Sequence, residues 1–164
     1  MIALGAESMQ RRLSLRPGVA DAIRSHGSET YPDECCGALI GRDEVVTGTY
    51  ALPNTTEEGP RRRFRVQPED YRDAERRAAE AGAELLGFYH SHPDHPARPS
   101  QYDLDHAWPF FSYIIVAVRG GVPEDMTSWR LQEDRSAFDQ ESLTYEHDSH
   151  SDPIAPLHRQ EGIG

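Results

Sequence analysis

Residues 85–92 read Leu-Leu-Gly-Phe-Tyr-His-Ser-His, an apolar run that ends in two histidines. The apolar part is long enough for an interior strand, and residues two apart on a strand point to the same face. His90 and His92 therefore project together. Two neutral imidazoles and a carboxylate form the protein ligand set of a catalytic zinc, which leaves the fourth position to water. The sequence thus predicts a metal site at the end of a buried strand.

The carboxylate is expected from the segment that follows this strand. Three prolines between residues 93 and 99 stiffen a loop, after which come Ser100 and Asp103. Ser-x-x-Asp is also typical of a helix start, where the serine caps the first turn. The two interpretations are compatible, because a helix that begins at Ser100 holds Asp103 rigidly in its first turn. Asp103 is therefore the expected third ligand.

Other histidines are weaker candidates. His95 lies in the proline-rich loop and His106 in the helix that follows it. Either residue fits a position next to the metal ligands rather than that of a ligand, because neither has a second histidine two residues away on a strand. The three histidines of the C-terminal segment are interpreted as solvated residues.

The complete pattern, His-Ser-His-x7-Ser-x2-Asp, resembles the signature of the JAMM metallopeptidases, the catalytic branch of the MPN domain superfamily. Residues 31–37, Tyr-Pro-Asp-Glu-Cys-Cys-Gly, resemble the family segment that carries a glutamate as general acid/base. The family pattern is Pro-x-Glu, so this role falls on Glu34 rather than on Asp33. The resemblance covers roughly residues 15 to 133. It implies an α/β domain of the α+β type, with an MPN/JAMM-like mixed, curved β-sheet flanked by helices.

The resemblance also implies an activity. It predicts a zinc-dependent metallopeptidase with one Zn²⁺ per chain, held by His90, His92 and Asp103 and completed by water. Glu34 is expected to move protons between water and the leaving amine, and Ser100 to donate a hydrogen bond to the developing oxyanion. Similar prokaryotic proteins act on ubiquitin-like modifiers or on sulfur-carrier proteins. The expected reaction is hydrolysis of a peptide or isopeptide bond at a C-terminal Gly-Gly tail.

Two other classes of function share parts of this pattern. A non-catalytic MPN scaffold would bind partners without chemistry, but a scaffold is expected to have lost metal ligands, and all three are present. A RadC-type protein associated with DNA repair carries a similar pattern, but usually with asparagine between the histidines and with an additional helical DNA-binding region. This chain shows neither of these RadC features.

Composition sets limits on partners and location. The chain has 164 residues and a net charge of −11, which argues against general binding of nucleic acid or of an anionic membrane. No stretch approaches eighteen apolar residues, and the N-terminus lacks the pattern of a signal peptide, so a cytoplasmic enzyme is expected. One catalytic domain is predicted over 15–146, with an N-terminal extension over 1–14 and a flexible tail over 147–164.

The remaining expectations concern the cysteines and the secondary structure. Cys35 and Cys36 are adjacent, so a strand would send them to opposite faces and we expect packing roles rather than a disulfide. Patterns of apolar residues and turn signals predict the other elements. Helices are expected over 16–27, from 67 to a stop at 82, and after 100, and strands over 36–41, 44–52, 62–66, 112–118 and around 129–131.

Overall fold

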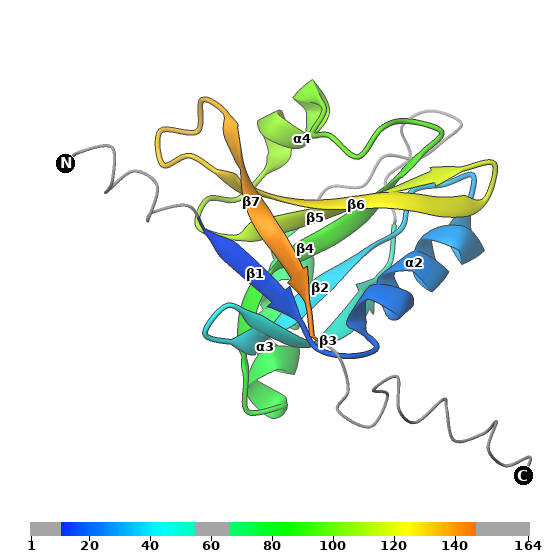
Figure 1. Ribbon diagram of the computed structural model, residues 1–164. Helices are drawn as coiled ribbons and strands as arrows, with labels where there is room; N and C mark the ends of the chain where they lie inside the picture. The colour runs from blue at the N-terminus through cyan, green and yellow to red at the C-terminus, as the bar shows by residue number, and fades with distance from the viewer. Residues whose placement is uncertain (1–10, 55–65, 147–164) are drawn as a thin grey trace, which may run out of the picture.

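The computed structural model describes residues 11–54 and 66–146 (Figure 1). Within these ranges the strands are β1 (Arg12–Leu15), β2 (Cys36–Arg42), β3 (Val45–Leu52), β4 (Glu84–Pro93), β5 (Ser112–Arg119), β6 (Val122–Leu131) and β7 (Phe138–Tyr145). The helices are α2 (Val19–Thr30), α3 (Pro68–Glu80) and α4 (Gln101–His106).

The centre of the sheet consists of β2, β4 and β5. β4 pairs with β2 in antiparallel and with β5 in parallel orientation, and most residues of these three strands are buried. Burial on both faces explains why their sequences are nearly continuous apolar runs rather than alternating ones. A parallel pair needs a crossover connection, and the segment that contains the prolines and α4 provides it between β4 and β5.

β2 and β3, which match the strands expected over 36–41 and 44–52, pair as an antiparallel hairpin. Asp43 and Glu44 make the turn with φ values of 53° and 64°, and a two-residue turn with both φ angles positive matches the right-handed twist of the strands that it joins. At the far end of the hairpin Cys36 lies opposite Leu52. Residues that precede β2 therefore lie beside those that follow β3.

The sheet closes on itself. The strand order is β1-β3-β2-β4-β5-β6-β7, and β1 is parallel to both β3 and β7. The mixed, curved sheet that the sequence predicts is confirmed, and β1 closes it into a barrel. This strand begins at Arg12, three residues before the expected domain boundary at residue 15. Neither β1 nor β7 was predicted.

The helices cover different parts of this sheet, with α2, α3 and α4 on separate sides of the molecule (Figure 1). α2 packs on the core that contains Cys35, Leu39 and Val116, whereas α3 packs on the core that contains Cys36 and Phe88. The adjacent cysteines thus point to opposite faces, as predicted. Both are buried free thiols.

Helix α3 matches its prediction, but α2 does not match at either end. α2 begins at Val19 and continues to Thr30, beyond the expected stop at Gly27. Gly27 is buried, and a Cβ atom on it would lie 3.0 Å from the side chain of Val118 and 3.4 Å from that of Ser91. The glycine therefore allows α2 to approach the sheet closely, and it does not end the helix.

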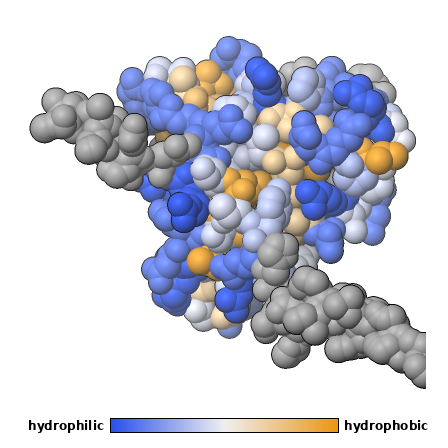
Figure 2. All heavy atoms as spheres, viewed as in Figure 1, coloured by the Kyte–Doolittle hydropathy of each residue, from blue (hydrophilic) through white to orange (hydrophobic). Residues whose placement is uncertain are grey.

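The described surface agrees with the polar composition. The face shown in Figure 2 is mostly hydrophilic, and its hydrophobic residues appear in small separate groups. Among the helices in residues 11–54 and 66–146, none has the length and apolarity needed to cross a membrane. The strand expected over 62–66, apart from residue 66, and the tail expected over 147–164 lie outside the described residues.

Candidate metal centre

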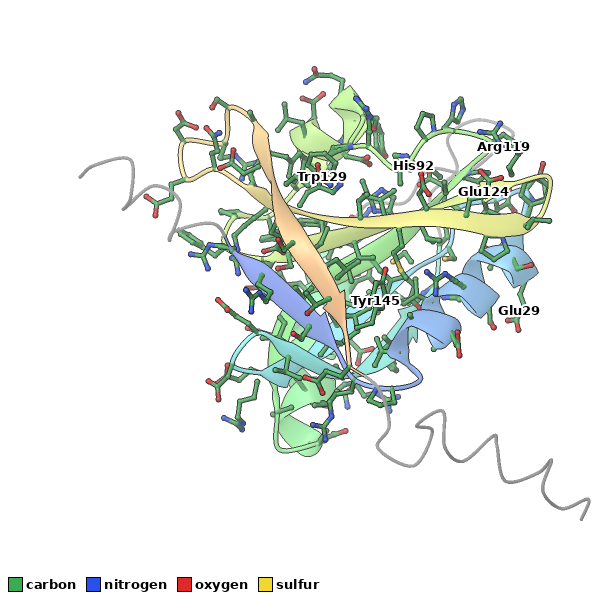
Figure 3. The ribbon with its side chains drawn as sticks, in the orientation of Figure 1. Glu29, His92, Arg119, Glu124, Trp129 and Tyr145 are labelled. Carbon is green, nitrogen blue, oxygen red and sulfur yellow. The ribbon has the colours of Figure 1, made fainter. Side chains whose placement is uncertain are left out.

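Strand β4 supplies the two histidines. His90 and His92 alternate with Ser91, so they share the face of β4 that also carries Phe88. Their residues are 8% and 6% exposed, which is unusual for imidazoles and calls for polar partners. His92 lies on the side of the molecule where α4 is found, away from Tyr145 at the end of β7 (Figure 3).

Helix α4 supplies the carboxylate. Ser100 is its N-cap, and the Ser100 hydroxyl accepts a hydrogen bond from the backbone N–H of Asp103. In return the Asp103 carboxylate accepts the backbone N–H of Ser100 at 2.9 Å. This capping box fixes the side chain in the first turn. The predicted helix start at Ser100 and the predicted ligand Asp103 therefore belong to one capping box.

The three side chains bring their ligand atoms together. The two Nε2 atoms of His90 and His92 are 3.2 Å apart. The carboxylate oxygens of Asp103 lie 3.3 Å from Nε2 of His90 and 3.1 Å from Nε2 of His92. Tetrahedral ligands placed 2.0–2.1 Å from zinc are about 3.3 Å from one another. The spacing and chemistry of the donors therefore fit a tetrahedral metal with one position left open.

A backbone carbonyl fixes the tautomer of His92. Nδ1 of His92 lies 2.9 Å from the carbonyl oxygen of Pro96. A carbonyl only accepts, so Nδ1 carries the proton and donates it. The neutral ring then has its lone pair on Nε2, which points at the cluster. The proline-rich loop thus prepares His92 for metal binding.

When no metal is bound, the charges in the cluster favour an ion pair between a protonated His90 and an ionised Asp103. Burial lowers the pKa of His90, but the adjacent Asp103 carboxylate, and more weakly Glu34, raise it to about 9. Burial raises the pKa of Asp103, yet the two imidazoles together hold it well below its usual range. A cation on these ligands would replace the imidazole proton, so metal binding is expected to release protons.

Metal-free protein is expected to lose stability as the pH rises. Because the pKa of His90 is raised from 6.5 to about 9, the ion pair with Asp103 contributes fully below about pH 6.5 and disappears as the pH passes through about 9. The free energy of unfolding should fall by on the order of 3 kcal/mol over this range. Thermal unfolding of the chelated protein at several pH values measures this fall.

Two variants serve as controls for this titration. His90→Gln removes the titrating ring and should flatten the dependence between about pH 6.5 and 9. His106→Gln removes a histidine that lies outside the cluster and should leave the dependence intact. A chelated wild-type protein whose stability does not change over this range would contradict the ion pair.

Glu34 lies just before β2, on the side of the sheet that carries the histidines. Cys36 lies opposite His90, and the backbone N–H of Ser91 donates to the carbonyl of Cys35, which brings Glu34 level with His92. The Glu34 carboxylate contributes to the raised pKa of His90. The structure therefore brings this distant residue to the cluster. Its side chain is half-buried.

Ser100 is exposed and lies directly beside the carboxylate ligand. Its hydroxyl oxygen accepts the Asp103 N–H, which uses a lone pair and leaves the hydroxyl proton free to be donated. The Ser100 hydroxyl can therefore cap α4 and donate a hydrogen bond to another group at the same time.

The rival histidines do not join the ligand atoms. The group of possible metal ligands found among the described residues contains His90, His92 and Asp103. Nδ1 of His106 instead donates to the carbonyl of Tyr102 within α4. His95 lies in the proline-rich loop, where its backbone N–H faces the carbonyl of His92.

Sequence reasoning missed two residues near Glu34. Ser91 accepts the backbone N–H of Cys35 through its hydroxyl, and Asn54 donates its side-chain amide to the carbonyl of Glu34. A signal for Ser91 was available, since strand alternation places this polar residue on a buried, otherwise apolar face. Asn54 carries no such signal, because its position depends on the register between β2 and β3.

Comparison with known proteins finds a matching family model and several similar relatives. Residues 16–132 match the model of the family described as prokaryotic homologues of the JAB domain. The desampylase of Haloferax volcanii is 37% identical over 116 residues, which cover 66% of this chain and 83% of the relative. A probable TtuB-protein conjugate cleaving protease of Thermus thermophilus is 32% identical over 103 residues, or 63% of this chain and 68% of the relative.

A solved structure supports the fold. The crystal structure of a JAB1/MPN-domain protein from Archaeoglobus fulgidus is 20% identical and superposes with a TM-score of 0.55, covering 82% of this chain and all of that one. The predicted MPN/JAMM-like fold is thereby confirmed.

Proposed function

Because the chain belongs to the family of prokaryotic homologues of the JAB domain, we propose that it is a zinc-dependent peptidase of protein conjugates. Its reaction would be hydrolysis of the peptide or isopeptide bond that follows the C-terminal Gly-Gly of a ubiquitin-like or sulfur-carrier protein. The observation that carries the proposal is the convergence of two imidazole nitrogens and a carboxylate with tetrahedral spacing. Relatives named as a desampylase and as a conjugate-cleaving protease support the substrate class.

His90, His92 and Asp103 would hold the metal. When bound, zinc supplies a water that ionises near neutral pH and a Lewis acid for the scissile carbonyl. The hydrogen bond from Nδ1 of His92 to the carbonyl of Pro96 fixes the tautomer and the orientation of this ring. The capping box holds Asp103 in place before any ligand arrives. Preorganised ligands need little rearrangement on binding.

Glu34 and Ser100 would handle the proton and the developing negative charge. The Glu34 carboxylate would take the proton of the attacking water and deliver it to the amine that leaves. The free hydroxyl proton of Ser100 would be donated to the carbonyl oxygen as that oxygen becomes an oxyanion. Glu34 precedes β2 and Ser100 caps α4, so two segments far apart in the sequence would act on a substrate carbonyl at the metal.

The direct test uses a fusion of a ubiquitin-like protein ending in Gly-Gly with a reporter protein. Zinc-loaded protein should release the reporter by cleavage directly after the second glycine. A matched fusion with Ala-Ala in place of Gly-Gly should resist cleavage. Complete inactivity on a panel of ubiquitin-like and sulfur-carrier fusions, with zinc bound in stoichiometric amount, would reject the peptidase and favour a scaffold.

Ser100→Ala is expected to lower kcat by about 10²- to 10³-fold, because it removes one oxyanion donor. The same change removes the N-cap of α4 and should cost about 1 kcal/mol of stability. Ser100→Thr retains both a cap and a donor and should recover most of the rate. Metal content is measured alongside. A rate loss that only follows loss of metal would contradict the oxyanion role.

A further inference from the structure

The peptide unit between Glu34 and Cys35 is held from two sides. Its carbonyl accepts a hydrogen bond from Nδ2 of Asn54 at 3.0 Å. Its N–H donates to the hydroxyl of Ser91 at 2.9 Å. The carbonyl and the N–H of one peptide unit lie in a rigid plane and point in opposite directions. Two bonds at its opposite edges therefore fix the orientation of that plane.

Ser91 also connects this peptide to the metal-binding strand. Its backbone N–H donates to the carbonyl of Cys35 at 3.2 Å, so the residue bonds this segment through both main chain and side chain. Ser91 is fully buried, and it lies between His90 and His92 on the opposite face of β4. Its hydroxyl therefore points away from the metal ligands. Ser91 therefore lies where it can hold the segment that contains Glu34 and Cys35.

Glu34 needs such support because it lies outside any strand. It precedes Cys36, the first residue of β2, and follows a turn. A proton-transferring group has to stay within hydrogen-bond reach of the atom that it serves. An error of about 1 Å in such a position can cost about a hundredfold in rate. A fixed peptide plane sets the direction in which the Glu34 side chain leaves the backbone.

We propose that Asn54 and Ser91 are positioning residues that clamp the Glu34–Cys35 peptide and thereby aim the Glu34 carboxylate at the metal centre. The inference rests on the proposed function and deepens it. Asn54 follows β3 and Ser91 lies within β4, so the clamp ties the base to both strands that flank β2. Neither side chain would touch the substrate or the metal.

The test compares Ser91→Ala, Asn54→Ala and the double variant by cleavage of the Gly-Gly fusion. Each single variant should lower kcat by about tenfold to a hundredfold while KM and bound zinc stay near wild type. Because both bonds hold one peptide, the double variant should lose less than the product of the single losses. In Ser91→Ala the amide of Cys35 should exchange its hydrogen with solvent at least about tenfold faster.

Ser128→Ala is the matched control. Ser128 is also a fully buried strand serine, and its hydroxyl donates to Glu141 far from Glu34 in the sequence. This variant should lose comparable stability but keep its kcat. If Ser128→Ala lowers kcat as much as Ser91→Ala, the effect is general destabilisation and the clamp is rejected.

The remaining outcomes separate the clamp from the proposed function. An active wild-type protein whose Ser91→Ala and Asn54→Ala variants keep their kcat would overturn the clamp alone. Variants that lose zinc together with activity would also overturn it, because the effect would then lie on the metal. A wild-type protein that carries zinc but cleaves no fusion would overturn the proposed function, and the positioning role with it.

Discussion

Asp103→Ala is expected to release the metal and to abolish cleavage. The carboxylate faces both imidazoles, at 3.3 Å and 3.1 Å, and no tetrahedral site remains when it is removed. Loss of a group that merely orients a ligand costs about 10- to 100-fold in metal affinity. Loss of the ligand itself should exceed that range. Zinc content of the purified protein and titration with a competing chelator measure the effect.

Asp105→Ala is the matched control for the loss of this ligand. Asp105 lies on the same short helix, is exposed, and accepts a hydrogen bond from Gln101. Its removal changes the net charge by the same amount without touching the cluster. It should leave zinc content and cleavage near wild type. If Asp103→Ala keeps stoichiometric zinc, the assignment of the third ligand is wrong.

Glu34→Gln is expected to keep the metal and to lower kcat by about 10²- to 10⁴-fold. The amide has nearly the same shape but cannot accept and return a proton, which is the contribution expected of a general base. Zinc content should stay at the wild-type level, because Glu34 is not among the clustered ligand atoms. Single-turnover cleavage of the Gly-Gly fusion separates this chemical step from substrate binding.

The adjacent carboxylate supplies the control for this variant. Asp33→Asn changes the same charge one residue earlier, where the backbone N–H bonds to the carbonyl of Thr30. It should cleave at nearly the wild-type rate. Wild-type turnover by Glu34→Gln would remove this residue from the role of base, and a large loss in Asp33→Asn would transfer that role to its neighbour.

The sequence predicts the local parts of the site well, since each part depends on short-range geometry. Strand alternation places His90 and His92 on one face, and a cap signature places Asp103 in the first turn of α4. These relations span only a few residues. The position of Glu34 came from the family pattern, because no local rule indicates which distant carboxylate reaches the histidines.

Elements that depend on tertiary contacts were not predictable. β7 carries polar residues at most positions, and Glu141 on it is buried only because Ser128 and Arg130 on β6 face its carboxylate. β1 has four residues and becomes a strand by pairing with both β3 and β7. At Gly27 the sequence predicted a helix end that does not exist. Glycine often ends a helix, but here it allows α2 to pack closely on the sheet.

The short helix α4 is expected to be stabilised when a metal binds. A helix of six residues is far below the length that is stable alone in water, so α4 depends on its cap and on the strands that it connects. The carboxylate of Asp103 accepts a hydrogen bond within the helix cap, and it also faces the histidines of β4. A cation bound by Asp103 and the histidines would therefore stabilise the crossover between β4 and β5, and its loss would leave this crossover less protected against hydrogen exchange.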